Sequence, residues 1–181
     1  MKSLYIILDT SSSMAPFDDA KQAIKELVSD DCLEKLGAIC IVEMSAQPRV
    51  LVKLSPALES GDIRQKILEK INELQPVGKA NVEETFALTA NLLKAQSNNT
   101  EVTYVLLISD GFTDEPITTC SFERYVECFQ KLGPEVIFVS FPCNRGFHYK
   151  NLKAFTKDKP NHLFGPQEMP AVLKFIFNEE D

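Results

Sequence analysis

Short apolar segments alternate along this chain with longer segments whose apolar residues recur at helical spacing, and this alternation strongly constrains the fold. Four apolar segments are bounded by polar or turn residues and predict buried strands: residues 4–8, 38–43, 102–108 and 136–141. Strands that are apolar on both faces are typical of a parallel sheet covered by helices.

A fifth strand is predicted at residues 48–54, where the side chains alternate. One set comprises Val50, Val52 and Leu54, and the other comprises Arg49, Leu51 and Lys53. This period of two predicts a half-exposed edge strand, which the turn at residues 45–48 joins to the preceding strand as a hairpin. A short last strand is expected near residues 162–164.

Helical spacing is found between the predicted strands and after them. The predicted helices are residues 18–28, 62–74, 82–95, 122–132, 151–155 and 169–177. Strands that alternate with helices imply parallel pairing through right-handed crossovers. We therefore predict an α/β fold with a doubly wound, mostly parallel central sheet, one antiparallel edge strand and helices on both faces. The predicted domain is single and spans residues 1–181.

Composition excludes several classes of partner and site. The 181 residues carry a formal net charge of −7, which argues against a nucleic-acid partner. The apolar run at residues 4–8 is too short for a signal-peptide core, and no apolar stretch is long enough for a membrane helix. The five cysteines are odd in number and lack C-x-x-C spacing, so neither a disulfide framework nor a zinc site is expected. We expect a cytoplasmic protein with buried, reduced cysteines.

Polar residues that could bind a metal ion follow two of the apolar segments. Asp9, Ser11 and Ser13 form a D-x-S-x-S motif after the first strand, and Asp110 precedes Gly111 at the end of a later strand. Ligands of doubly wound folds bind beyond the carboxyl ends of the strands, where the strand order reverses. If these strands are neighbours there, two carboxylates face each other and need a cation to offset their repulsion. Carboxylate and hydroxyl oxygens suit Mg²⁺ or Mn²⁺.

The predicted metal ligands are therefore Asp9, Ser11, Ser13 and Asp110. Four protein ligands do not fill the roughly six-oxygen shell of Mg²⁺, so positions remain for water or for a partner. No catalytic residue is predicted, because His148 and His162 lie outside any recognisable catalytic motif and are expected on the surface or in loops.

The two motifs resemble those of von Willebrand factor type A domains. The D-x-S-x-S sequence is followed by Met14, as is common there, and Ser109 before Asp110 completes an S-D-G strand end. Asp114 matches an acidic residue often found just after it. The resemblance covers essentially the whole chain in element order, spacing and length. It implies a metal-ion-dependent adhesion site for Mg²⁺ or Mn²⁺, whose coordination a partner's acidic side chain commonly completes.

One position departs from the family's pattern. Ala80 stands where the family usually supplies a Thr in the loop before its third helix, and Thr85 lies about one turn too far along the chain. The lost hydroxyl is expected to weaken the site or to leave its place to water. Asn81 is expected to cap the following helix.

The resemblance implies a metal-dependent protein-binding module inside the cell, not an enzyme. Small stand-alone domains of this type are similar to bacterial proteins found with tellurite-resistance systems, which act with kinase and phosphatase partners. One alternative is a Mg²⁺-dependent phosphohydrolase. Against it, the chain has no G-x-x-x-x-G-K-[ST] loop, and Ser11 stands where a D-x-D phosphatase motif would place its second Asp. The other alternative is a metal-free structural scaffold, which Ala80 makes possible.

Overall fold

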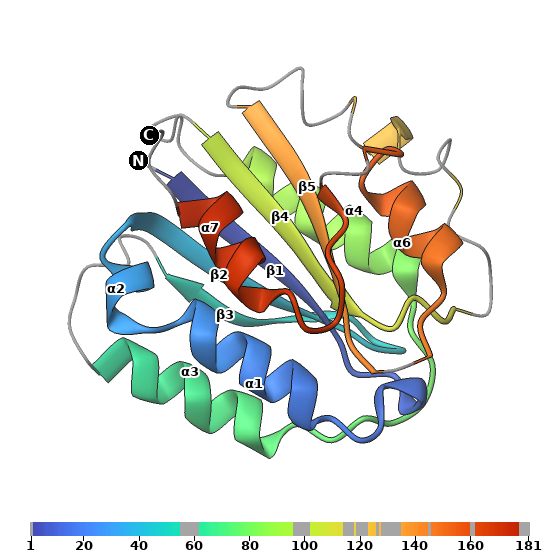
Figure 1. Ribbon diagram of the computed structural model, residues 1–181, viewed down its shortest axis with the longest axis horizontal. Coiled ribbons are helices and arrows are strands. Elements are labelled where there is room, and N and C mark those ends of the chain that lie inside the picture. The colour runs from blue at the N-terminus through green and yellow to red at the C-terminus, as the bar shows by residue number, and fades with distance from the viewer. Residues whose placement is uncertain are drawn as a thin grey trace.

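A five-stranded sheet forms the centre of the computed structural model (Figure 1). Its strands are β1 (Lys2–Asp9), β2 (Leu36–Met44), β3 (Arg49–Leu54), β4 (Val102–Ser109) and β5 (Glu135–Pro142). They lie in the order β3-β2-β1-β4-β5, and every neighbouring pair is parallel except β2 and β3. The structure describes residues 2–54, 62–95, 102–113, 118, 123–125, 127, 135–144, 146–159 and 162–177. The predicted mostly parallel sheet with an antiparallel edge strand is confirmed.

Helices cover both faces of this sheet. They are α1 (Asp18–Leu27), α2 (Asp30–Leu33), α3 (Asp62–Glu73), α4 (Val82–Lys94), α6 (Tyr149–Phe155) and α7 (Met169–Phe177), with a 3-10 turn, η1, at Ser12–Met14. One layer contains α1, α3 and α7, which lie in front of the sheet in Figure 1. The other contains α4 and α6. The short α2 was not predicted from the sequence.

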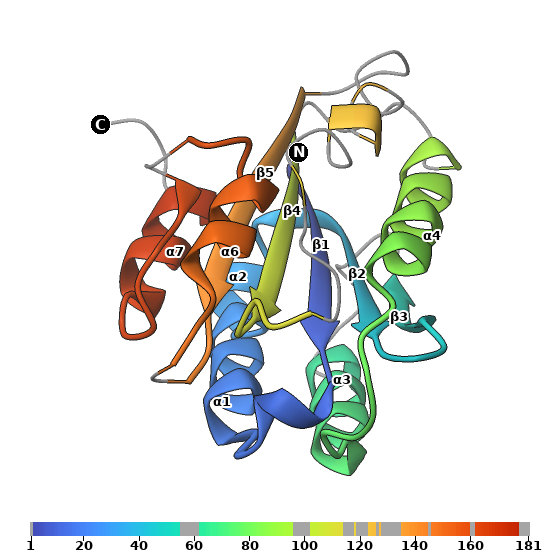
Figure 2. The same cartoon turned by 90° about the vertical axis from the view of Figure 1, so that its right-hand side faces the viewer.

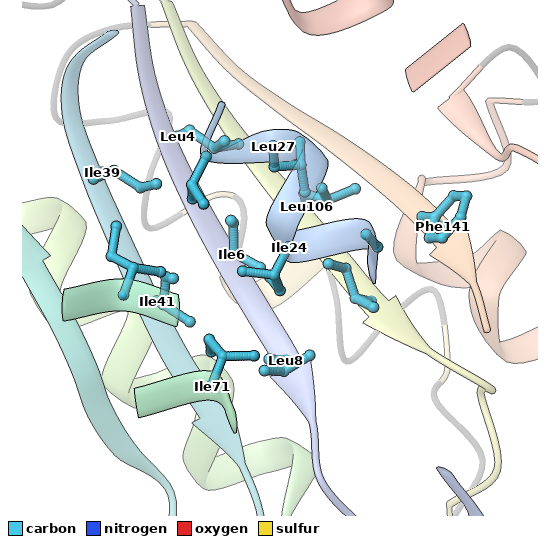
Figure 3. Close-up of a cluster of buried hydrophobic side chains, with 14 of the residues drawn as sticks. Leu4, Ile6, Leu8, Ile24, Leu27, Ile39, Ile41, Ile71, Leu106 and Phe141 are labelled. Carbon is cyan, nitrogen blue, oxygen red and sulfur yellow. The ribbon is translucent and has the colours of Figure 1, made fainter. Parts of the chain in front are cut away.

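The two layers follow from the alternation of side chains along β1. Leu4, Ile6 and Leu8 belong to the core beneath α1 and α3, whereas Tyr5 and Ile7 belong to the core beneath α4 and α6. Figure 3 shows the first set beside side chains of both helices. A fully buried side chain of this size stabilises the fold by about 1.5–3 kcal/mol. The central strand is therefore anchored from both faces, which fixes the position of its polar end.

The predicted alternation in β3 is wrong at one point. Val50 is 36% exposed, whereas Leu51 and Val52 are both buried. The register between β2 and β3 shifts there: Val52 pairs with Ile41 and Val50 pairs with Val42, which leaves Leu51 between the pairs. An extra residue of this kind breaks the period of two.

The last predicted strand is also wrong. Around residues 162–164 the structure has only an isolated bridge between Ser140 and Leu163, because a single residue of this segment pairs with β5 in the sheet before the chain turns to α7. The helix predicted at residues 122–132 lies largely outside the described residues, although residues 123–125 and 127 are helical.

The cysteines that the structure describes lie in the core. Cys32, Cys40 and Cys143 are buried and free, while Cys120 and Cys128 lie outside the described residues. In the part of the chain that the structure describes, no helix is both long and apolar enough to cross a membrane. His162 is buried, contrary to expectation, and its Nδ1 lies 3.1 Å from the carbonyl oxygen of Phe138.

Candidate metal site at the ends of β1 and β4

The predicted site lies where the strand order reverses. The chain passes from β1 to β2 and β3 on one side and returns to β4 and β5 on the other, so β1 and β4 are adjacent parallel strands. Leu8 pairs with Ile108, which places Asp9 opposite Ser109 and one residue from the level of Asp110. In Figure 2 the arrowheads of β1 and β4 point toward the same end of the sheet.

The Asp9 carboxylate is held by serine hydroxyls. Its Oδ1 accepts hydrogen bonds from the Ser11 backbone N–H at 2.9 Å and from Ser11 Oγ at 2.6 Å. Its Oδ2 accepts one from Ser109 Oγ at 2.5 Å. Ser11 Oγ also lies 3.2 Å from Ser13 Oγ. The three residues of the D-x-S-x-S motif are therefore joined in one hydrogen-bonded group.

Asp110 is held mainly through its backbone. Its N–H points to Met14 Sδ at 3.2 Å, and its carbonyl accepts a hydrogen bond from the His148 N–H at 2.7 Å. Its Oδ1 accepts a hydrogen bond from the Phe112 N–H at 3.0 Å. The Met that follows the first motif therefore supports the second one.

Burial gives the two carboxylates an unfavourable environment when they are charged. Asp9 is fully buried, and Asp110 is 1% exposed. The pKa of Asp9 is raised from its usual 3.8 to about 6, chiefly because burial disfavours the carboxylate. Hydrogen bonds from Ser109 and Ser11 lower it, and the charge of Asp110 contributes to the increase. Among the described residues, no cationic side chain forms an ion pair with either aspartate.

The turn after β1 is fixed by its second residue, Thr10. Its N–H donates to Met44 O at 3.1 Å, and its carbonyl accepts from the Val77 N–H at 2.8 Å. Its hydroxyl donates to Glu43 Oε1 at 2.9 Å, and Arg49 Nε binds the other oxygen of Glu43 at 2.6 Å. These contacts join the D-x-S-x-S turn to the end of β2 and to the edge strand β3.

A hollow of about 270 Å³ opens over the serines. Its lining residues are Ser11, Ser12, Ser13, Gly78, Lys79, Ala80, Phe112 and Thr113. Ala80 thus lines the same hollow as the serines of the motif. This location agrees with the alignment of Ala80 to the position where the family usually has a Thr. Thr85 does not replace that hydroxyl, because its Oγ1 donates to Asn81 O at 2.6 Å within α4. Asn81 caps α4 as predicted, since its Oδ1 accepts from the Glu84 N–H at 3.1 Å.

Several supporting residues were missed by sequence reasoning. Ser109 could have been found, because it is the hydroxyl residue of the S-D-G strand end. Asn151 gave no local signal, yet its Nδ2 donates to Gly111 O at 2.8 Å from about forty residues further along the chain. His148 is similarly remote: it binds Asp110 and caps α6. Asp114 and Glu115 lie outside the described residues.

The donor set fits a hard divalent cation. Two carboxylates and two hydroxyls lie at the same end of the sheet, and the charge of Asp110 acts on Asp9; oxygen ligands of this kind suit Mg²⁺ or Mn²⁺. No group of three or more His, Cys, Asp or Glu side chains suitable for a metal occurs in the described ranges. The hydroxyls of Ser11 and Ser13 would therefore be needed as ligands, and Mg²⁺ would also keep waters.

Comparisons with known proteins agree with the motifs and the topology. The sequence model of the von Willebrand factor type A domain matches residues 4–112. No curated protein sequence matches the chain.

Three solved structures share the fold. A von Willebrand factor type A protein from Catenulispora acidiphila has a TM-score of 0.68 and 16% identity, and the match covers 97% of this chain but only 42% of that one. BatB from Bacteroides thetaiotaomicron has a TM-score of 0.68 and 13% identity, with 95% of each chain covered. The manganese-loaded TRAP protein of Plasmodium vivax has a TM-score of 0.68 and 12% identity, with 98% of this chain and 74% of that one covered.

The family model covers more than half of the chain, and the sheet order and strand-end motifs agree with it. Domains of this kind commonly mediate protein interactions, are mostly not enzymes and often bind a divalent metal ion. The chain belongs to the von Willebrand factor type A domain family.

Proposed function

We propose that this protein is a metal-dependent protein-interaction module, in which Asp9, Ser11, Ser13 and Asp110 hold one Mg²⁺ or Mn²⁺ ion. The observation that carries the proposal is a pair of buried aspartates without a cationic partner among the described residues. Charged groups are rarely buried unless they are paired or coordinate a metal. A divalent cation would remove the repulsion between these two carboxylates and satisfy them together.

The partner's contribution follows from the ligands that the chain lacks. Ala80 has no side-chain oxygen to offer at the wall of the hollow, so the side chains supply four ligands to an ion that takes about six. We infer that a partner donates an Asp or Glu carboxylate to one of the remaining positions. The two aspartates neutralise most of the ion's charge, so a third carboxylate binds exchangeably. The formal net charge of −7 repels an acidic partner over the rest of the surface. The bound ion would then specifically attract the partner's carboxylate.

The family supports this proposal, and the related TRAP structure is loaded with manganese. The biological setting is a further part of the proposal. We propose a cytoplasmic, non-enzymatic role in a stress-response or phosphorylation-linked system such as tellurite resistance, in line with the members of the family that are found with such systems.

The test is recovery of the partner followed by a binding measurement. The tagged protein is used to capture partners from its source cells in Mg²⁺ or in excess chelator, and the affinity of a purified partner is then measured by calorimetry. Binding should require the metal, be lost in Asp9→Ala and depend on one acidic residue of the partner. Equal affinity with Mg²⁺ and with chelator would show that the partner uses another surface, and would contradict the proposal.

A further inference from the structure

Glu43 is a buried acidic residue near the proposed metal site, but it is not one of the four proposed ligands. It is the second-last residue of β2 and pairs with Leu8 of β1, the residue before Asp9. Glu43 is only 8% exposed. A buried carboxylate is costly unless a charge partner and hydrogen bonds satisfy it. The partners of Glu43 therefore indicate what it does in the fold.

The two oxygens of the Glu43 carboxylate have different partners. Oε2 accepts a hydrogen bond from Arg49 Nε at 2.6 Å, in an ion pair whose arginine side chain is 66% exposed and whose glutamate side chain is 10% exposed. Oε1 accepts a hydrogen bond from Thr10 Oγ1 at 2.9 Å. Arg49 is also the cross-strand neighbour of Glu43 in the ladder between β2 and β3. The carboxylate thus connects an exposed cation at the edge of the sheet to the residue between Asp9 and Ser11.

Thr10 is the residue through which this connection reaches the proposed ligands. It is 1% exposed, and its backbone N–H and carbonyl are both hydrogen-bonded. Since Asp9 precedes it and Ser11 follows it, a displacement of Thr10 moves both ligands. Residues that orient metal ligands through hydrogen bonds typically change metal affinity by about 10–100-fold when they are lost. The contact between Thr10 and Glu43 therefore bears directly on the geometry of the site.

Burial of Glu43 makes the positive charge of Arg49 necessary. Removal of one partner of a buried ion pair leaves an uncompensated charge. Without the guanidinium, the Glu43 carboxylate would turn toward water, and this movement would take away the acceptor that Thr10 uses. The ion pair between Arg64 and Asp30 differs, because its atoms are 3.4 Å apart and the Asp30 side chain is 66% exposed. Water solvates a pair of that kind, and its loss has little effect.

We propose that Arg49 is a positioning residue for the proposed metal site. Arg49 neutralises Glu43, Glu43 holds the Thr10 hydroxyl, and Thr10 keeps Asp9 and Ser11 in place for the ion. This inference rests on the proposed function, because it concerns the ligands of that ion. It adds that an exposed cation on the edge strand β3, outside both strand-end motifs, controls the affinity of the site.

Calorimetric titration of Mn²⁺ into Arg49→Gln tests the proposal, because charge and position predict opposite results. The substitution removes a positive charge near the site, and this change alone would tighten the binding of a cation. A displaced turn would weaken it. We expect the Mn²⁺ affinity to fall about tenfold, as is typical when a contact that orients metal ligands is lost. Arg49→Lys keeps the charge and should retain most of the affinity.

Further variants test each step of the connection. The double variant Glu43→Gln/Arg49→Gln has no charge in either side chain, and its amide oxygen can still accept the Thr10 hydroxyl, so it should recover most of the lost affinity. In a Thr10→Val background, Arg49→Gln should cause no further loss, because the connection is already broken. Arg64→Gln is the matched control and should leave the Mn²⁺ affinity unchanged, because Arg64 belongs to the exposed ion pair. Urea unfolding checks that each variant is folded, as expected for a side chain as exposed as that of Arg49.

The outcomes separate the positioning role from the proposed function. A Mn²⁺ affinity of Arg49→Gln equal to or above that of the wild type would overturn the positioning role while the proposed function stands. Equal losses in Arg49→Gln and in the double variant would also overturn it, because Arg49 would then not act by neutralising Glu43. A full further loss in the Thr10→Val background would show that Arg49 does not act through Thr10. Absence of Mn²⁺ binding in the wild type would overturn the proposed function and this inference with it.

Discussion

At the scale of single residues, Asp9 is the most constrained side chain of the site. It is fully buried, both of its carboxylate oxygens accept hydrogen bonds, and these bonds come from Ser11 and Ser109. Hydrogen bonds to the charged form lower a carboxyl pKa, but burial outweighs them here and raises the pKa to about 6. The metal-free protein thus retains an unfavourable charge that protonation or a cation can remove.

The first prediction concerns the pH dependence of this cost. Because the folded-state pKa of Asp9 is raised from 3.8 to about 6, the native state binds a proton that the unfolded state lacks between these pH values. The destabilising contribution of Asp9 is therefore present above pH 6 and is relieved as the pH falls toward 4. Asp9→Asn removes this contribution.

Urea unfolding of both metal-free proteins between pH 4 and pH 7.5 measures the effect. The free energy of unfolding of the wild type, relative to Asp9→Asn, should increase by on the order of 2 kcal/mol as the pH falls. A difference that does not vary with pH would show that the Asp9 pKa is not raised.

The second prediction concerns Thr10, whose hydroxyl joins the turn of the proposed metal site to Glu43. Thr10→Val leaves a buried oxygen of Glu43 without this donor, which should cost about 1–3 kcal/mol of stability. The displaced turn should also weaken Mn²⁺ binding by about tenfold, a typical effect of losing a hydrogen bond that orients metal ligands. Thr10→Ser keeps the hydroxyl and should retain most of the affinity.

Thr89→Val provides the matched control for Thr10. Its hydroxyl is also buried, but it donates to Thr85 O inside α4, away from the turn. Urea unfolding and Mn²⁺ calorimetry of the three variants distinguish a positioning role from a structural one. Equal losses of Mn²⁺ affinity in Thr10→Val and Thr89→Val would show that Thr10 has no specific effect on the site.

The sequence predicts that Asp9 and Asp110 lie near each other if β1 and β4 are neighbours, because each aspartate stands at the end of a buried strand and parallel neighbouring strands end at the same edge of a sheet. The pairing of β1 with β4 meets that condition. The support of Asp110 by His148 and of Gly111 by Asn151 could not be predicted. Those contacts depend on where α6 packs, and no local pattern specifies that position.

At the scale of elements, the sequence predicts most strands and helices closely, and the exceptions have physical causes. Five strands were expected within one or two residues of their observed ends, because four are short apolar runs and the fifth has alternating side chains. The bulge at Leu51 could not be predicted, because it depends on pairing between β2 and β3. Lys70 Nζ, on α3, donates to Leu51 O at 2.7 Å and so satisfies a carbonyl at this irregular point.

The third prediction concerns the turn between β4 and the following loop. Gly111 has a φ of +75°, and an added Cβ would lie 2.8 Å from His148 O and 2.9 Å from Leu152 Cγ. Gly111→Ala therefore combines an unfavourable backbone conformation with a clash against α6. We expect a loss of about 3 kcal/mol or more in the free energy of unfolding.

Gly78→Ala is the control for that loss. Gly78 also has a positive φ, +71°, but an added Cβ would meet nothing within 4 Å. Its substitution should cost only about 1–2 kcal/mol, the backbone contribution alone. Urea unfolding of both variants measures the difference, and equal losses would show that the contact between Gly111 and α6 does not restrict this position.

At the scale of the whole molecule, the topology brings distant polar residues together. The strand order reverses between β1 and β4, so segments about a hundred residues apart in sequence end side by side. The alternation of strands and helices predicts a doubly wound sheet, but it leaves open whether these two strands are neighbours, which the observed pairing establishes. The hollow above the serines could not be predicted, because it depends on how the loop containing Ala80 folds against the serines.

The central claim is that Asp9 and Asp110 supply the charge that holds a divalent cation. Calorimetric titration of Mn²⁺ into the wild type, Asp9→Ala, Asp110→Ala and Asp30→Ala tests it most directly; Asp30, an exposed carboxylate on α2, is the control. Unfolding measurements should show that each variant is folded. This is expected because either site substitution relieves the repulsion between the two carboxylates. We predict one Mn²⁺ per wild-type chain, the same affinity in Asp30→Ala, and no measurable binding in either site variant. Unchanged Mn²⁺ affinity in Asp9→Ala and Asp110→Ala would contradict the claim.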